Sequence, residues 1–100
     1  MRIEPWARTY ASAKTIAASG ITRTSGNANG EVVPNKAATQ YWFEYGTSAN
    51  LGLITSVQSA GSSNTKVSVS LPLSNLAPAT TYYFRLNAQN NFGTSNGTIL

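Results

Sequence analysis

The feature that most constrains the fold is an alternation of apolar and polar side chains that begins at Tyr82. In an extended chain, Phe84, Leu86 and Ala88 would lie on the same face as that tyrosine, and the polar residues between them on the other. Pro78 lies just upstream and cannot donate a hydrogen bond to a sheet, so the strand must begin after it. The pattern therefore predicts a half-buried β-strand that is entered through a tight corner.

Further strand-like segments occur along the chain, separated by turn residues. They are expected at residues 15–18 with a resumption at 21–22, 25–33, 40–46, 65–71, and after the turn at 90–93, with a short strand and loops in 46–63. In the second segment, Asn29-Gly30 also matches a two-residue hairpin turn, an alternative that would leave only very short flanking strands. The preferred interpretation is one strand with Gly30 where the facing sheet approaches closely. The fold class predicted is all-β, a seven-stranded antiparallel β-sandwich with Greek-key connections.

The corner before the alternating strand resembles a feature of a known family. The spacing of Leu76, Pro78, Thr80 and Tyr82 is similar to the tyrosine corner of fibronectin type III and related immunoglobulin-like sandwiches, in which the Tyr hydroxyl bonds to upstream main chain. With the motifs at 31–35, 40–46 and 90–97, the chain resembles fibronectin-type repeats of bacterial surface proteins and phage structural proteins. The resemblance implies a β-sandwich domain over residues 14–100, preceded by residues 1–13 as an N-terminal arm or an extra edge strand.

One departure from that family concerns the core. Fibronectin type III domains usually carry a Trp on the second strand, where this chain has Ala28 or Gly30. Three aromatic residues on the next strand, Tyr41, Phe43 and Tyr45, are expected to supply the missing bulk.

The residue types that most enzymes and metal sites use are missing from the sequence. Without His, Cys or Asp there is no triad base, no thiol nucleophile and no usual set of transition-metal ligands. Glu31 and Glu44 are expected to face outward from opposite sheets, which is unsuitable for a glycosidase pair. We therefore expect a protein that is not an enzyme and that has no catalytic residues, cofactor or metal.

Charge and hydropathy narrow the possible partners. The net charge is +4, but the seven Lys and Arg residues are scattered, which does not favour nucleic acid as a partner. No apolar run approaches the roughly 20 residues of a membrane helix. The chain begins with Met and shows no apolar leader. This pattern favours a product made without export, such as a virion component, over a module cut from a secreted protein.

Five aromatic residues are candidate partner-binding sites. Trp42 and Tyr83 are expected on outward faces of neighbouring strands, where they would form an aromatic platform for sugar rings or a protein neighbour. The alternative is a cross-strand pair that only stabilises the sheet. Phe92 is expected at the tip of a turn, a common place for recognition. Trp6 and Tyr10 lie in the segment before the domain, which would pack either on the domain's own sheet or on a neighbouring subunit.

The function predicted from these observations is structural or adhesive and uses protein surface contacts. A phage virion decoration or tail component is the first choice, with a capsid or tail protein as neighbour. The alternative is a carbohydrate- or protein-binding module of an extracellular bacterial enzyme or adhesin. The expected location is accordingly the virion or the bacterial cell surface.

Overall fold

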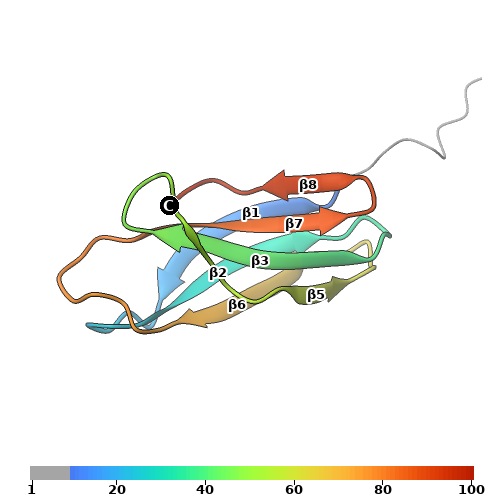
Figure 1. Ribbon diagram of the computed structural model, residues 1–100. Helices are drawn as coiled ribbons and strands as arrows, with labels where there is room; N and C mark the ends of the chain where they lie inside the picture. Colours follow the sequence, from blue (N-terminus) through green and yellow to red (C-terminus); the bar gives the residue numbers. More distant parts are fainter. Residues whose placement is uncertain (1–9) are drawn as a thin grey trace, which may run out of the picture.

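The computed structural model describes residues 10–100, and these form an antiparallel β structure without helices (Figure 1). The strands are β1 (Ser12–Ser19), β2 (Gly26–Val33), β3 (Thr39–Gly46), β4 (Leu53–Ile54), β5 (Gln58–Gly61), β6 (Val67–Leu73), β7 (Tyr83–Asn90) and β8 (Gly93–Asn96).

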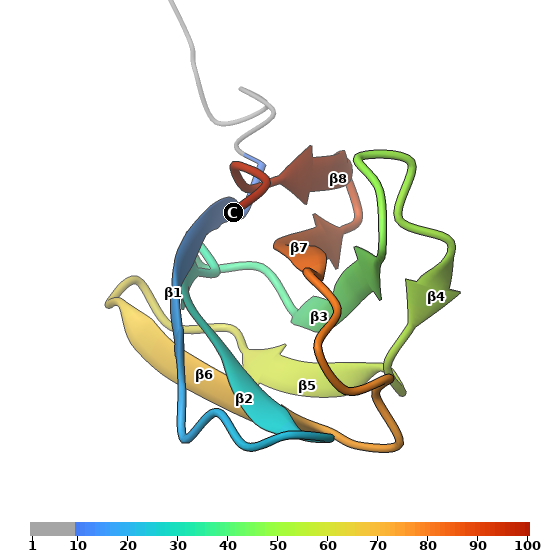
Figure 2. The same cartoon turned by 90° about the vertical axis from the view of Figure 1, so that its left-hand side faces the viewer.

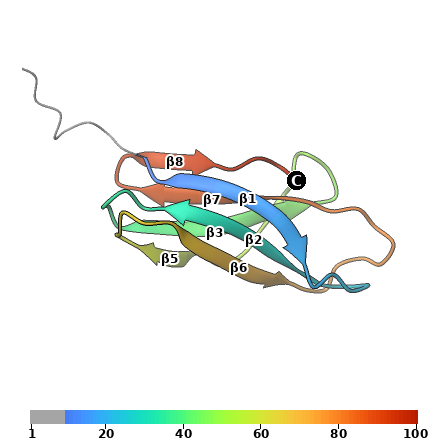
Figure 3. The ribbon, with the colours of Figure 1, turned by 180° about the vertical axis from the view of Figure 1, so that it is seen from behind.

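The strands divide into two sheets that pack face to face. One sheet has the order β1-β2-β6, and the other has the order β4-β3-β7-β8, with β5 also paired to β3. The chain crosses between the sheets after β2, after β5 and after β6. Figure 2 shows the two layers end-on, and Figure 3 shows the three-stranded sheet in front. The predicted fold class, an all-β antiparallel sandwich, is confirmed. The described residues contain eight strands because residues 46–63 supply two short ones.

The first strand differs from the sequence prediction at both ends. It begins at Ser12, and the residue before it, Ala11, is only 2% exposed, so the sandwich starts earlier than residue 14. It ends before Gly20, whose φ of 58° turns the chain. The predicted resumption at 21–22 is wrong, because Ile21 lies in a loop and is 74% exposed.

The second strand is continuous, as the preferred interpretation predicted. Asn29 pairs with Ser70 and Gly30 pairs with Val69, so the alternative hairpin at Asn29-Gly30 is wrong. Gly30 lies where the sheets approach each other, because a Cβ added to it would be 2.6 Å from Leu86 Cδ2 on β7.

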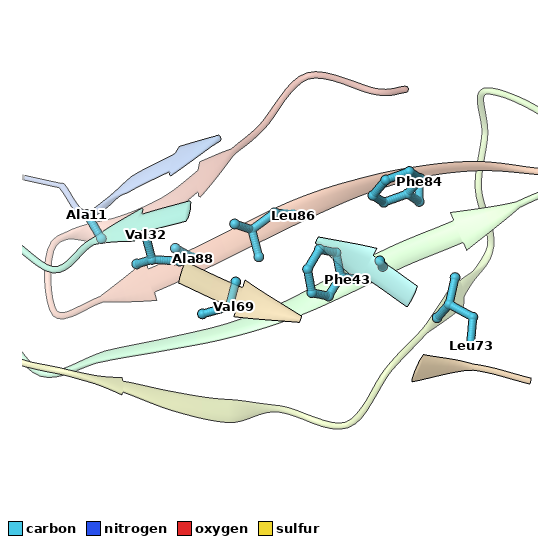
Figure 4. Packing of buried hydrophobic residues seen from close by; sticks show 9 residues of the cluster. Ala11, Val32, Phe43, Val69, Leu73, Phe84, Leu86 and Ala88 are labelled. Carbon is cyan, nitrogen blue, oxygen red and sulfur yellow. The ribbon is translucent and has the colours of Figure 1, made fainter. Parts of the chain in front are cut away.

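Apolar side chains from both sheets meet in the core (Figure 4). Phe43 is fully buried, and its ring lies 6.4 Å from that of Tyr41 and 6.2 Å from that of Phe84 between centroids. The buried apolar residues are Ala11, Ala28, Val32, Phe43, Val69, Leu73, Phe84, Leu86 and Ala88. The alternation on β7 therefore predicted the buried face of that strand correctly.

A hydrogen bond accepted by the side chain of Thr15 links the first strand to the opposite sheet. Its buried Oγ1 accepts a bond of 3.1 Å from the backbone N–H of Leu86 on β7. The carbonyl of Leu86 in turn accepts a bond of 2.7 Å from Gly97 N–H. Beyond β8 the chain continues to pair with β7, because Leu100 and Phe84 exchange two backbone hydrogen bonds. These contacts fasten β1 to the five-stranded sheet along one side of the sandwich.

The corner before β7 contains the hydrogen bond that the tyrosine-corner pattern predicted. The backbone N–H of Ala77 donates a bond of 2.8 Å to the hydroxyl oxygen of Tyr82, five residues further on. Thr80 Oγ1 donates to the carbonyl of Pro78 within the same corner. The tyrosine therefore fixes the path of the chain from β6 into β7.

We expect Tyr82→Phe to lower the free energy of unfolding by about 1 kcal/mol, because the Ala77 N–H loses its acceptor. The effect should lie near the lower end of the usual range, since Ala77 is exposed and water can replace the hydroxyl. Denaturant unfolding of both proteins gives the difference. A change below about 0.3 kcal/mol would show that this hydrogen bond does not stabilise the corner.

Candidate functional site

The outer face of the five-stranded sheet carries the largest group of candidate residues, and it faces the viewer in Figure 1. The pairing of β3 with β7 places Trp42 opposite Asn87, and Glu44 opposite Arg85. Tyr83 lies opposite Gly46, at one end of the same face. We call Trp42, Glu44, Arg85 and Asn87 the outer-face cluster.

The predicted aromatic platform of Trp42 and Tyr83 is wrong. Tyr83 lies four residues along β7 from Asn87, the partner of Trp42, and four residues of strand span about 13 Å. The pair of Glu44 and Arg85 occupies the space between them. The alternative of a stabilising cross-strand aromatic pair is excluded for the same reason. Both aromatic residues face outward, with Trp42 half-buried and Tyr83 exposed at 38%.

The polar part of the outer-face cluster converges on one carboxylate oxygen. Glu44 Oε1 accepts hydrogen bonds from Arg85 Nε at 2.9 Å and from Asn87 Nδ2 at 2.6 Å. It also lies 2.8 Å from Arg85 Nη2. The side chains of Glu44 and Arg85 are only about a quarter exposed, so the bonds are partly shielded from water. The guanidinium and the carboxylate are therefore held in fixed positions beside the Trp42 side chain.

Asn87 is a member of the cluster that the sequence analysis missed. It lies on the outward face of β7, yet it is only 2% exposed. Because its Nδ2 donates to Glu44, its Oδ1 points away from that carboxylate, and this buried oxygen has no hydrogen-bond partner among residues 10–100. Its neighbours across the sheet are Trp42 on β3 and Asn96 on β8. The signal for the burial of Asn87 is the large side chain of Trp42 opposite it on β3. This signal becomes visible only once the pairing register of β3 and β7 is known.

We expect the cluster to make folding stability depend on pH in the acid range. The hydrogen bond from Asn87 is the main cause that holds the pKa of Glu44 below its usual range; burial opposes this, and Arg85 lowers the pKa further. A carboxyl with a lower pKa in the folded state stabilises the protein above its unfolded pKa of about 4.3, and this stabilisation is lost as the pH falls. Urea unfolding between about pH 6 and pH 3 should therefore show a shallower acid loss in Glu44→Gln than in the wild type.

A control for this experiment is Glu31→Gln, which removes the other carboxylate side chain among the described residues. Glu31 lies on β2, in the opposite sheet, and pairs with Lys66 at 3.3 Å, where the Lys66 side chain is 59% exposed. An exposed pair of this kind contributes little, so this variant should keep the acid loss of the wild type. Identical pH profiles for wild type and Glu44→Gln would contradict the role assigned to Glu44. The positions of Glu31 on β2 and Glu44 on β3 also confirm the prediction that these two carboxylates lie on opposite sheets.

Phe92 and Tyr10 lie at the same end of the domain. Phe92 is in the turn between β7 and β8 and is 41% exposed, as predicted. Tyr10 is 47% exposed, and a Cβ added to the adjacent Gly93 would lie 3.2 Å from its ring. The carbonyl of Tyr10 accepts a bond of 2.7 Å from Asn35 Nδ2. Tyr10 therefore packs against the domain's own β7–β8 turn, whereas Trp6 lies outside the described residues.

Two hollows lie on either side of the corner and were not predicted. The larger one, of about 440 Å³, is lined by β4, by the end of β6 and by the chain leading to Tyr82. The smaller one, of about 210 Å³, lies under the β1–β2 loop and has Phe84 among its lining residues. Leu73, Leu76 and Tyr82 line both hollows. Nothing in the alternation of residues signals them, because their linings combine strand and loop residues that only the folded chain brings together.

Neither a metal cluster nor a membrane helix occurs in the described part of the chain. Residues 10–100 contain no group of three His, Cys, Asp or Glu side chains placed to hold a metal ion. They also contain no helix with the length and hydropathy that a membrane crossing requires.

The fold is similar to solved structures of the sensor domain of the anti-sigma factor RsgI4 in Pseudobacteroides cellulosolvens. A short form of that domain matches with a TM-score of 0.68 and 22% identity, over 89% of this chain and 88% of that one. Its solution structure matches with a TM-score of 0.67 and 21% identity, over 89% and 70%. No protein-family model and no curated protein matches the sequence. At this identity the likeness shows the fold alone, and the resemblance to fibronectin type III stays a prediction.

Proposed function

We propose that this chain is a non-enzymatic recognition module that binds a protein neighbour through the outer face of its five-stranded sheet. The observation that carries the proposal is the outer-face cluster, in which Glu44 fixes Arg85 beside the half-buried Trp42, with the exposed Tyr83 at the end of the same face.

The residue types on this face are those that dominate protein interfaces. Trp, Tyr and Arg are enriched among residues that contribute most to binding, and they are typically surrounded by polar groups that exclude water. Here Gln40, Gln89 and Thr94 lie on the same face, around the cluster. Because Arg85 is already held by Glu44, little side-chain entropy is lost when a partner docks on it.

A carbohydrate ligand is less well supported by the same geometry. Stacking on sugar rings was proposed for a continuous platform of Trp42 and Tyr83, but an ion pair separates these side chains. A patch in which an ion pair separates two aromatic residues fits a protein surface better than a row of sugar rings.

The setting that we propose is an assembly on a virion or on a bacterial cell surface. The similar solved structures are described as sensor domains of an anti-sigma factor, and this supports recognition as a role that such a sandwich performs. A decoration or tail component of a phage remains our first choice, and a module of a bacterial surface protein is the alternative.

Site-specific photo-cross-linking tests the proposed face. A photoreactive amino acid at Gln89, which lies on the outer face beside the cluster, should cross-link one protein from the source assembly. The same group at Ser68, an exposed residue on the three-stranded sheet, should not. With that partner purified, Trp42→Ala and Tyr83→Ala should each raise the Kd at least about 10-fold, while Lys66→Ala, just before β6 of the opposite sheet, should change it less than about 2-fold.

Two outcomes would contradict the proposal. Equal cross-linking from both positions, or unchanged affinity in Trp42→Ala and Tyr83→Ala, would show that the outer face is not the interface. Specific binding on a glycan array that disappears in Trp42→Ala would instead assign this face to carbohydrate.

A further inference from the structure

The smaller of the two hollows is a cavity of about 210 Å³. It opens at the end of the sandwich where the β1–β2 loop meets the chain leading into β7. Its inner lining includes three buried apolar residues, Ala28 on β2, Leu73 on β6 and Phe84 on β7. A smaller apolar cavity, of roughly 150 Å³, is large enough to hold benzene in another protein. The space here is therefore sufficient for one aromatic ring with a short substituent.

The cavity exists because the residues of β1 and β2 that face it are small. Ala18, Gly26 and Ala28 line it, although larger side chains at these positions would fill it. The sequence predicted that the aromatic residues of β3 replace this missing bulk. Phe43 is buried in the core with Tyr41 and Tyr45 packed against it, but these three residues are absent from the cavity lining and so do not fill this end of the core. The volume is left open instead of being filled by neighbouring side chains.

Hydrogen bonds brace the loop at the mouth of the cavity. The backbone N–H of Thr22 donates to the carbonyl of Ser25 at 2.9 Å, and the hydroxyls of the same two residues lie 2.6 Å apart. The carbonyl of Thr24 accepts a bond of 2.9 Å from Leu76 N–H, which joins this loop to the chain before β7. The mouth is thus formed before any ligand arrives, which reduces the entropic cost of binding.

The mouth also carries a cation that has no counter-ion within residues 10–100. Arg23 lines the cavity, and it forms no ion pair among residues 10–100. Both described Glu side chains are occupied elsewhere, Glu31 by Lys66 and Glu44 by Arg85. An anionic group at the mouth would therefore meet Arg23 without competition from either described Glu side chain.

We propose that this cavity binds a small aromatic carboxylate, with the ring against Ala28 and Phe84 and the carboxylate at Arg23. The carboxylate belongs either to a free acid or to the C-terminal residue of a peptide, since both present the same chemistry. This site lies on a different part of the domain from the outer-face cluster and does not depend on the proposed protein contact.

Titration of the whole chain with phenylacetate, followed by two-dimensional NMR, tests the site. Saturable shifts are expected at amides of the lining, such as Ala28 and Leu76, with a Kd on the order of 1 mM or below. Phenylacetamide, which has the same shape without the charge, should bind at least about 5-fold more weakly. A tripeptide ending in Phe provides the second source of the carboxylate, and its Kd relative to that of phenylacetate shows which source fits better.

Two variants separate the contribution of the cavity to binding from the contribution of the Arg23 charge. Arg23→Gln changes an exposed loop residue, so it should keep the fold, and it should weaken phenylacetate at least about 5-fold while leaving phenylacetamide unchanged. Ala28→Leu should fill the cavity and abolish saturable binding; Ala18→Val is the substitute if that variant does not fold. The proposal is overturned if phenylacetate gives no saturable shifts up to about 10 mM. It is also overturned if the shifts cluster away from the lining, or if Arg23→Gln binds both compounds as the wild type does.

Discussion

Replacing Phe43 by alanine should lower the free energy of unfolding by about 3 to 5 kcal/mol, which is the usual cost of removing a fully buried aromatic side chain. The Phe43 ring is completely inaccessible, and its edge-on contact with Tyr41 and tilted contact with Phe84 would both be lost. Small domains are stable by only about 5 to 15 kcal/mol, so this single change should remove a large part of the total. Urea unfolding followed by tryptophan fluorescence measures the loss.

The matched control for this prediction is Gln40→Ala on the same strand. Gln40 is exposed on the outer face of β3, so the variant should change stability by less than about 0.5 kcal/mol. Phe43→Leu keeps most of the buried volume and should cost less than Phe43→Ala. A loss below about 1.5 kcal/mol in Phe43→Ala would show that the two sheets collapse around the site or that the ring is not central to the core.

The sequence predicted the fold well because period-two alternation records which face of a strand is buried. On β7 it identified Phe84, Leu86 and Ala88, and all three are buried. The same rule failed for Asn87, whose position in the alternation is outward although the side chain is covered. Alternation describes one strand at a time, and the burial of Asn87 depends on side chains that neighbouring strands bring beside it.

The candidate site could be predicted only in part for a related reason. The sequence correctly placed Trp42 and Tyr83 on outward faces of two paired strands. It did not give the offset between β3 and β7, and this offset places the two residues about 13 Å apart with Glu44 and Arg85 between them. The sequence indicated missing bulk at Ala28, but the cavity beside it was missed because its lining also includes the β1–β2 loop and the chain before β7, which only the fold brings together.

At Gly30 the structure confirms the physical reason that the sequence suggested for a glycine in the middle of β2. The sequence suggested that this glycine lies where the facing sheet approaches, and an added Cβ would be 2.6 Å from Leu86 Cδ2 and 2.9 Å from the carbonyl oxygen of Lys14. The Leu86 side chain can rotate, but the Lys14 carbonyl belongs to the backbone of β1, which is paired along β2. We therefore expect Gly30→Ala to lower the free energy of unfolding by about 2 to 3 kcal/mol through overpacking.

A control and a double-mutant cycle identify overpacking as the cause of this loss. Gly26→Ala lies on the same strand, where the nearest atom to an added Cβ is Ile21 Cγ1 at 3.6 Å, so it should be neutral or slightly stabilising. In a Leu86→Ala background the closest obstacle is gone, so Gly30→Ala should cost at least about 1 kcal/mol less than in the wild type. Part of the cost should persist, because the contact with the Lys14 carbonyl remains. Equal costs of Gly30→Ala in the two backgrounds would show that Leu86 is not the obstacle and that the sheets are farther apart at this point.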